Sequence, residues 1–474
     1  MTRARAIRLA GLLVLGMPLG AQTYDLVIRN GRVVDPESGL DAVRNVGIRG
    51  SRIAALSPAP LSGGAVIDAS GLVVAPGFID LHSHGQDLEN YRYKAMDGVT
   101  TALELEVGVG DVDAWYAERS GGAPIHFGAS AGHIPARMAV MHDPGRFLPT
   151  GAAAHRAASE EEITDLKRRL EQGLKRGALG VGFGIGYTPA ASRWEILEMF
   201  RVAARFHAPC FVHVRMTGED SIQAVEEVIA AAAITGAPLH IVHITSMGLG
   251  STPKLLQMIA EARARNLDVT TELYPYTAAM TELESALFDP GWEEKLGIGY
   301  GQLQWVATGE RLTAETFARY RQAGGPVIMH MIPPEAVEAA MASPLTMIAS
   351  DGLIQQGKGH PRGSGSFARV LGHYVRETHT LTLMDAIRKM SLMPAQRLEA
   401  YAPAMRNKGR IRVGADADLT IFDPQRVSDR STYEEPARYS TGIEYVLVNG
   451  ALVVRGGQLV PDAMPGRPVR AVVR

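Results

Sequence analysis

Two histidines separated by a single residue follow a short apolar run early in the chain, within residues 73–84 (VVAPGFIDLHSH). Because strand side chains alternate, His82 and His84 at positions i and i+2 fall on one face of an extended strand that ends with them. Neutral imidazole is a common metal ligand, so the pair could hold one metal ion. A histidine pair alone is a weak signal, and the prediction of a metal site depends on further ligands downstream.

Two carboxylates follow in the next strand-like run, residues 99–106, where Glu104 and Glu106 alternate with Leu103 and Leu105. One face of a barrel strand meets the surrounding helices, so we expect the leucines on that face and the carboxylates inside. Buried carboxylates without a cation are costly, and a metal would neutralise them. Glu106 lies nearer the end of the strand and is the better candidate ligand. The alternative is a buried ion pair with an Arg or Lys.

Three further candidates lie at the ends of later apolar runs: His213 in 210–215, His243 in 239–244 and Asp351 in 346–352. A carboxylate beside a metal can orient a water molecule and take its proton, while the metal lowers the pKa of that water towards about 7. The alternative for Asp351 is a turn-capping role before Gly352, because Asp-Gly pairs are frequent in turns.

The elements that would position these residues alternate between strands and helices. Strand-like runs lie near 99–106, 125–130, 179–184, 210–215, 239–244, 268–274, 326–330 and 346–350. Apolar residues at helical spacing predict helices over 160–176, 194–206, 222–235 and 254–265. With the strand before His82, this pattern predicts an α/β fold with a closed parallel (β/α)8 barrel, which places its catalytic groups at the C-terminal ends of its strands.

Short strands and turns occupy both ends of the chain, over 24–74 and again at 417–422 and 445–450. We expect these ends to fold together as a small β-sandwich. The predicted division is a β-sandwich domain over 23–74 plus 405–474 and a catalytic barrel over 75–404.

Residues 1–22 differ from the rest, because Arg3, Arg5 and Arg8 precede an apolar run over 9–19 and the small residues Gly20 and Ala21. This pattern predicts a signal peptide, with a retained N-terminal anchor as the alternative, and an exported protein, periplasmic or secreted. The single cysteine excludes an intrachain disulfide. A net charge of −2 over 474 residues argues against nucleic acid or an anionic membrane as a partner.

Taken in order, these motifs resemble the amidohydrolase superfamily and, within it, the D-aminoacylase (N-acyl-D-amino-acid deacylase) group. The resemblance runs from about residue 24 to the C-terminus. It rests on residues 75–84 (APGFIDLHSH), 98–101 (GVTT), 213–215 (HVR) with a histidine thirty positions after the first, 274–276 (YPY), 350–352 (SDG), 360–362 (HPR) and 414–424 (GADADLTIFDP).

This resemblance implies a metal-dependent (β/α)8 barrel with a β-sandwich built from both chain ends. It implies that His82 and His84 bind one metal ion and that His213 and His243 bind the other. It also makes Asp351 the catalytic base.

On the substrate side, the resemblance implies that Arg362, eleven residues beyond that aspartate, binds a carboxylate of the substrate. The planar guanidinium suits such a bidentate contact. We expect Tyr187, Tyr274 and His360 to contribute to substrate binding as well.

The chain departs from the group at two positions. The group carries a cysteine ligand at the end of the second strand, where this chain reads ELEVG over 104–108 and has no cysteine. An ungapped match puts Val107 at the cysteine position. Glu106 can replace the cysteine as ligand only if the strand end is adjusted by one residue. A bridging carboxylate is more tolerant of two metals than a thiolate. The group often has a substrate-binding lysine at the position of Thr245.

These features predict a hydrolase with one or two divalent ions, of the Zn²⁺ type. We expect it to cleave an amide bond of N-acyl-(D-)amino acids or dipeptide-like small molecules with a free carboxylate, and Asp351 to accept a proton from water and pass it to the leaving amine. Two alternatives stay open: a dipeptidase or cyclic-amide hydrolase on the same scaffold, and a non-catalytic periplasmic metal- or ligand-binding protein. The predicted metal ligands are His82, His84, Glu106, His213, His243 and Asp351.

Overall fold

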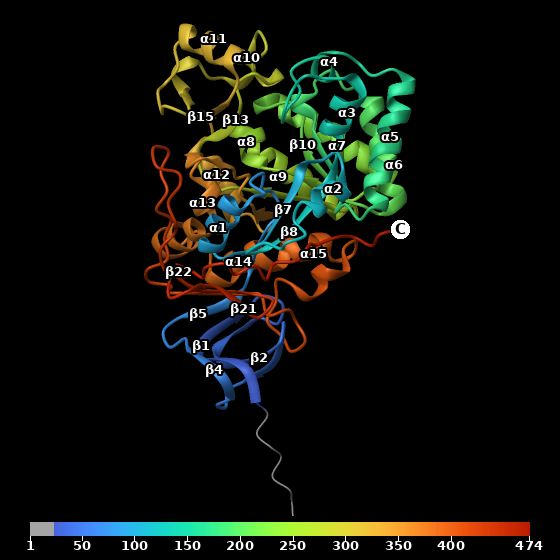
Figure 1. The fold of residues 1–474 in the computed structure, drawn as a ribbon. Helices are drawn as coiled ribbons and strands as arrows, with labels where there is room; N and C mark the ends of the chain where they lie inside the picture. Colours follow the sequence, from blue (N-terminus) through green and yellow to red (C-terminus); the bar gives the residue numbers. More distant parts are fainter. Residues whose placement is uncertain (1–22) are drawn as a thin grey trace, which may run out of the picture.

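The computed structural model describes residues 23–474, so the predicted signal peptide over 1–22 lies outside the described residues. Figure 1 shows a central barrel with a sheet built from the chain ends on one side and a small subdomain, drawn in yellow, on the opposite side.

The barrel is an eight-stranded sheet in which every neighbouring pair is parallel, in the order β16-β12-β11-β10-β9-β8-β7-β6. The open edge between the first and last strands is joined by an isolated bridge between Ser83 and Gly352. A nearly closed parallel barrel is therefore confirmed. Its strands are β6 (Phe78–Asp80), β7 (Val99–Val109), β8 (His126–Gly132), β9 (Val181–Gly184), β10 (Cys210–His213), β11 (Leu239–Ile241), β12 (Val269–Leu273) and β16 (Thr346–Ile348).

One run expected to alternate with the barrel helices lies elsewhere. Residues 326–330 form β15 (Pro326–Met329), which pairs antiparallel with β13 (Ala279–Glu282) and β14 (Leu303–Trp305). An apolar run predicts a buried strand but does not specify its partner, and here the partner is an insertion between β12 and β16. The insertion also contains α10 (Trp292–Leu296) and α11 (Ala314–Ala323).

The predicted helices are confirmed to within two residues as α5 (Glu160–Lys175), α6 (Arg193–Phe206), α7 (Ser221–Thr235) and α9 (Thr252–Ala264). The first of them begins with a capping box, in which Ser159 accepts from the backbone of Glu162 and the Glu162 carboxylate accepts from the backbone of Ser159. The remaining helices are α1 (Leu88–Met96), α2 (Val112–Ala117), α3 (His133–Met141), α4 (Ala152–His155), α8 (Ile244–Gly248), α12 (Pro334–Ala342), α13 (Arg362–Arg369), α14 (Leu383–Ile387) and α15 (Met393–Glu399).

The chain ends form one sheet of nine strands, in which β5 lies between β1 and β19 and so joins the two ends. The first half of β1 pairs with β4 and the second half with β5, across an irregularity before Gly31. A Cβ atom on Gly31 would lie 2.5 Å from Val74, so this close approach requires glycine. The strands are β1 (Thr23–Asp35), β2 (Leu40–Arg49), β3 (Arg52–Ser57), β4 (Ser62–Asp68), β5 (Val73–Pro76), β19 (Leu419–Phe422), β20 (Ile443–Val448), β21 (Ala451–Arg455) and β22 (Gln458–Leu459).

Part of the range expected to belong to the terminal domain packs on the barrel instead. Val469 donates its backbone N–H to Phe127 of β8, and its carbonyl accepts the hydroxyl of Tyr116. The backbone N–H of Ala471 donates to Gly177 before β9. The C-terminal segment 466–471 therefore lies against the end of the barrel opposite the site described below.

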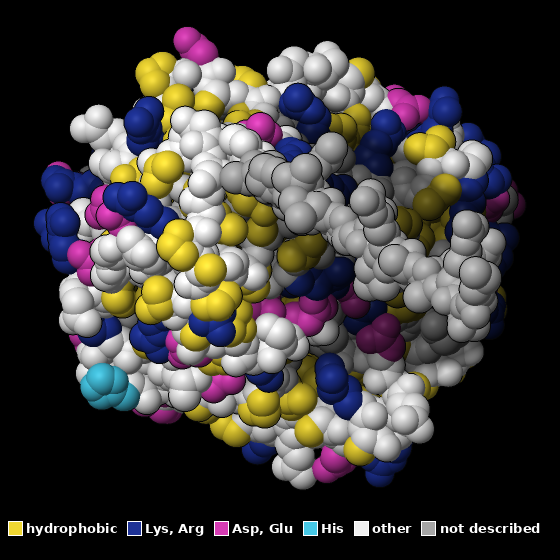
Figure 2. Space-filling view, turned by 90° about the horizontal axis from the view of Figure 1, so that it is seen from below, with side chains coloured by type: hydrophobic (Ala, Val, Ile, Leu, Met, Phe, Trp, Pro, Cys, Tyr) yellow, Lys and Arg dark blue, Asp and Glu magenta, His cyan; other side chains and the backbone are white. Residues whose placement is uncertain are grey.

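The described residues contain no helix that is both long and apolar enough to cross a bilayer. On the face shown in Figure 2, basic and acidic side chains are interspersed among apolar ones.

Candidate metal centre

The sequence predicted a strand that ends with His82 and His84. Both candidate ligands instead lie just beyond the end of their strand. Strand β6 ends at Asp80, and the chain then continues through isolated bridges in which His82 faces Glu104 and Ser83 faces Gly352. The backbone N–H of Asp351 donates to the carbonyl of His82 at 2.7 Å. The backbone between β6 and β16 thus holds the histidines against the aspartate.

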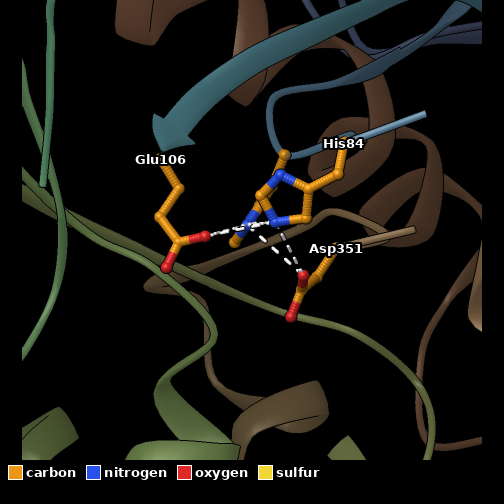
Figure 3. A group of neighbouring side chains, drawn as sticks. His84, Glu106 and Asp351 are labelled. Atoms are coloured by element: carbon orange, nitrogen blue, oxygen red, sulfur yellow. Dashed lines mark hydrogen bonds and ion pairs between the residues drawn. The ribbon is translucent and has the colours of Figure 1, made fainter. Parts of the chain in front are cut away.

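Four side-chain atoms converge where these segments meet (Figure 3). His82 Nε2 lies 3.0 Å from Glu106 Oε2 and 3.4 Å from Asp351 Oδ1. His84 Nε2 lies 3.2 Å from each of the same two oxygens and 3.2 Å from His82 Nε2. A tetrahedral zinc ion with bonds of about 2.0–2.1 Å separates its ligands by about 3.3–3.4 Å. These atoms therefore fit the edges of a zinc site.

The other oxygen of Glu106 belongs to a second group. Glu106 Oε1 lies 2.9 Å from His213 Nδ1 and 3.6 Å from His243 Nε2. These three residues form a second potential metal site. Because one carboxylate serves both groups, the donor set fits two bridged divalent ions as well as one.

The charges of the centre also fit a cation. Burial alone would lower the pKa of His82, but the carboxylates of Asp351 and Glu272 outweigh it and raise that pKa to about 10. Burial opposes ionisation of Glu106, yet hydrogen bonds from the surrounding histidines, His213 first, hold its pKa well below the usual range. Two buried carboxylates thus require positive charge, which protonated imidazoles or a metal can supply.

Each histidine of the pair is oriented by a carboxylate behind it. Glu104 Oε2 lies 2.8 Å from His84 Nδ1, and Glu272 Oε1 lies 2.7 Å from His82 Nδ1. These contacts leave both Nε2 atoms directed at the centre, as outer partners of metal-binding histidines do. Between the two glutamates of β7, it is therefore Glu106 whose carboxylate joins the converging atoms.

The leucines of β7 do not face the helices as expected. Leu103 and Leu105 pack with Phe211 and Met347 in a cluster with residues from β6, β10 and β16. Side chains from strands that are not neighbours can meet only inside the barrel. Simple alternation fails because β7 loses its register with β8 beyond Glu104.

Two residues around the centre have unusual backbone conformations. His243 has a φ of 34° and Asp351 a φ of 50°, the left-handed region that non-glycine residues seldom occupy. Below Asp351, Ser350 donates to Asp80 at 2.6 Å, and Lys94 forms an ion pair with the same carboxylate at 2.9 Å. This buried network supports the strained turn that presents Asp351.

A small cavity opens onto the centre. Arg362 lines it, with NH1 3.0 Å from Asp351 Oδ2. The Nε atom of this guanidinium has no hydrogen-bond acceptor among the described residues, and NH1 has the ion pair with Asp351. Tyr187 also lines the cavity, and its hydroxyl accepts from Thr281 of β13 at 3.0 Å.

Tyr274 and His360 lie behind the cavity rather than among the residues that line it. The Arg362 guanidinium stacks over the Tyr274 ring at 4.5 Å, and the backbone N–H of Arg362 donates to His360 Nδ1. Both residues therefore support Arg362. Thr245 is fully buried, and its hydroxyl has no hydrogen-bond partner in the part of the chain described.

Sequence reasoning missed Glu272 behind the centre and Glu282 in the cavity wall. Glu272 stands in an apolar run, which is the signal that singled out Glu104 and Glu106, so it could have been found. Glu282 lies in the insertion, where no strand-end pattern marks it.

Comparison with known proteins identifies relatives along nearly the whole chain. A family model described as "Amidohydrolase family" matches residues 65–122 and 129–454. N-acyl-D-glutamate deacylase of Alcaligenes xylosoxydans xylosoxydans is 34% identical over 95% of this chain and 97% of that protein. D-Aminoacylase of the same organism is 31% identical over 91% of this chain and 95% of its own length.

A solved structure of a related deacylase is also similar to this chain. The N-acyl-D-glutamate deacylase of Bordetella bronchiseptica, complexed with zinc and a phosphonate mimic of the tetrahedral intermediate, matches with a TM-score of 0.82 and 29% identity. The match covers 95% of this chain and 100% of that one.

Proposed function

The chain belongs to the amidohydrolase family, and from this premise we propose that it is a metal-dependent hydrolase that cleaves the amide bond of N-acyl-D-amino acids or related dipeptide-like substrates. The observation that carries the proposal is the position of Asp351. One of its oxygens faces the converging imidazoles and the other contacts Arg362. A base is thus placed between a metal centre and a guanidinium that can bind a substrate carboxylate.

The residues of the centre have different roles in the proposed reaction. We propose His82, His84, Glu106, His213, His243 and Asp351 as the ligands of one or two zinc ions. When bound, zinc lowers the pKa of a water molecule and polarises the substrate carbonyl. Arg362 binds the carboxylate of the amino-acid portion and so holds the amide next to Asp351.

Asp351 moves the proton. Burial would raise the pKa of its carboxyl, but Arg362 and His82 hold that pKa well below the usual range, so the group is a carboxylate at neutral pH. It accepts a proton from the attacking water and then donates it to the nitrogen of the leaving amine. A substrate carboxylate that engages Arg362 weakens the ion pair and makes Asp351 a stronger base.

The test is a substrate screen with the zinc-loaded protein. N-Acetyl-D- and N-acetyl-L-amino acids, dipeptides and 5-substituted hydantoins are compared by release of free amine or by ring opening. We expect hydrolysis of the N-acyl-D-amino acids. Hydrolysis of the hydantoins alone would replace the proposal with a cyclic-amide hydrolase.

Asp351→Asn tests the mechanism, because an amide has the same shape but cannot accept the proton. We expect kcat to fall by about 10²–10⁴-fold while zinc stoichiometry and the circular dichroism spectrum stay unchanged. A near wild-type rate at full zinc occupancy would assign Asp351 a turn role instead.

We also propose that residues 1–22 direct export and are removed. Support comes from the three arginines that precede an apolar run too short for a stable membrane anchor. N-terminal sequencing of the protein recovered from the periplasm is expected to begin near residue 22. An intact Met1 in the cytoplasmic fraction would contradict export.

A further inference from the structure

Glu282 places a third carboxylate in the cavity of the metal centre. It is the last residue of β13, which pairs with β15 so that Glu282 lies opposite Pro326. Both residues line the cavity together with Asp351 and Arg362. The insertion, which lies at the end of the barrel away from the chain-end sheet in Figure 1, therefore contributes a charged group to the substrate space.

The Glu282 carboxylate has no hydrogen-bond or ion-pair partner in the described part of the chain. No hydrogen bond or ion pair reaches the Glu282 side chain from any residue in 23–474, although the residue is only partly exposed. Burial, with a smaller contribution from the charge of Glu284, raises its pKa to about 7. Ionising a half-buried carboxylate is costly without a cation beside it, so a cation at this position would be bound favourably.

The other charges of the cavity do not compensate Glu282. Arg362 is the only Lys or Arg among the described residues that line it, and this guanidinium is already paired with Asp351. Glu106 adds a carboxylate that is engaged with the histidines. Among the described residues that line the cavity, none therefore offers Glu282 a free positive charge, which leaves that role open to a bound molecule.

A larger hollow adjoins the cavity. This second hollow, on the surface, shares Met280, Pro326 and Leu353 with the cavity, so the two lie next to each other against these residues. Met280 and Glu282 point to the same side of β13 by strand alternation. A chain that leaves the metal centre through this space passes Glu282.

We propose that Glu282 binds a cationic group of the substrate, an amine or guanidine, and so sets a preference for positively charged substrates. This inference rests on the proposed function and narrows its substrate class. The cation can belong to the side chain of the amino acid or to the acyl group, because both extend from the scissile amide. A substrate with a second carboxylate meets the like charge of Glu282 and is disfavoured, in contrast to what the names of two of the relatives indicate for those proteins.

The experiment compares substrates of equal shape and different charge on the zinc-loaded full-length mature protein. The side-chain arm pairs N-acetyl-D-arginine with N-acetyl-D-citrulline and adds N-acetyl-D-glutamate. The acyl arm pairs N-(4-aminobutanoyl)-D-leucine with N-pentanoyl-D-leucine. Wild-type kcat/KM is expected to favour the cationic member of one pair by about 10–100-fold, the range of a charge-assisted hydrogen bond.

Glu282→Gln removes the charge and keeps the volume. We expect it to lower kcat/KM on the preferred cationic substrate by about 10–100-fold, leave the neutral partner nearly unchanged and improve the acidic substrate. Glu284→Gln is the matched control, because Glu284 lies two residues on, accepts from the backbone of Gly325 and does not line the cavity. Measured at pH 8, above the pKa of Glu282, this control should keep the wild-type order of preference among the substrates.

Equal effects of Glu282→Gln on the cationic and neutral members of both pairs would overturn the inference. If the wild type hydrolyses no N-acyl amino acid, the proposed function fails, and calorimetric binding then decides the role of Glu282. D-Arginine against D-citrulline and 4-aminobutanoate against pentanoate are the probes. Tighter wild-type binding of the cation, lost in Glu282→Gln, supports the inference, and equal binding refutes it.

Discussion

Glu106 gives one oxygen to each of the two groups of converging side chains, whereas Glu104 contacts the outer nitrogen of His84 and accepts from the backbone N–H of Gly108. Replacing them with glutamine should therefore have different effects. Glu106→Gln removes the charge that both groups share, and we expect bound zinc to fall to one equivalent or less. Glu104→Gln should keep the wild-type stoichiometry when zinc is in excess, with affinity weaker by about 10–100-fold.

Elemental analysis after gel filtration in zinc-containing buffer measures this difference. Normal zinc in Glu106→Gln together with loss of zinc in Glu104→Gln would reverse the assignment of the two carboxylates.

Arg362 is buried, paired with Asp351 through NH1 and stacked on Tyr274, and its Nε atom has no hydrogen-bond acceptor among the described residues. We expect Arg362→Ala to lower the ratio of kcat/KM on an N-acyl amino acid to kcat/KM on its C-terminal amide by about 10–100-fold. The ratio isolates recognition of the carboxylate, because any effect through Asp351 is common to both substrates. An unchanged ratio would remove Arg362 from carboxylate binding.

Most residues of the centre could be predicted from their type and their position in the sequence. The histidines and acids at the ends of apolar runs lie side by side, because parallel barrel strands direct their C-terminal ends to one place. The directions in which the side chains of β7 point could not be predicted from the sequence. The choice between Glu104 and Glu106 depends on the irregular end of β7, and alternation alone placed Leu103 and Leu105 on the wrong side.

At the scale of elements, β12 contributes to the centre through Glu272, which accepts from His82 and from the backbone N–H of His243. Burial opposes ionisation of this carboxylate, but the adjacent His82 charge holds its pKa at about 2. Glu272→Gln keeps an acceptor for both donors and removes the charge. We expect zinc affinity to fall by about 10–100-fold with little change in fold.

Competition with a zinc chelator measures that affinity, and Glu284→Gln serves as a control distant from His82. An unchanged dissociation constant would limit Glu272 to a packing role.

The strands and helices of the barrel could be predicted because each has a clear apolar period. The insertion between β12 and β16 could not be assigned, since β15 is as apolar as a barrel strand and only its antiparallel partners distinguish it. The residue that this insertion adds to the cavity, Glu282, was consequently not expected.

At the scale of the molecule, a buried cluster ties the terminal sheet to the barrel. Asp418, just before β19, pairs with Lys408 at 2.6 Å and contacts His126 of β8 at 3.2 Å. It also accepts the backbone N–H of Asn449 between β20 and β21. Asp418→Asn breaks this pair and leaves Lys408 with Asp416 alone. We expect the free energy of unfolding to fall by about 3 kcal/mol, the low end for loss of one partner of a buried pair.

The effect should depend on pH. Burial would raise the pKa of Asp418, but Lys408 and His126 hold it well below its usual value near 4. Its stabilisation is therefore fully present above about pH 4 and is lost as the pH falls towards the folded-state pKa. Urea denaturation at pH 7 and at pH 3 should show a smaller difference between wild type and variant at pH 3. A difference that grows on acidification would exclude an ionised Asp418.

Two pairings delay the completion of folding until late in synthesis. They join β5 to β19 and residues 466–471 to β8. A ribosome that has released residues 23–400 has supplied every proposed metal ligand, yet β5 still has a bare edge and Phe127 lacks the backbone partner that covers it. Translation must therefore continue for some seventy residues beyond residue 400 before the nascent protein can close. During that interval the chain remains open to chaperones, and a stop codon at position 466 would yield every proposed metal ligand in an unfinished barrel.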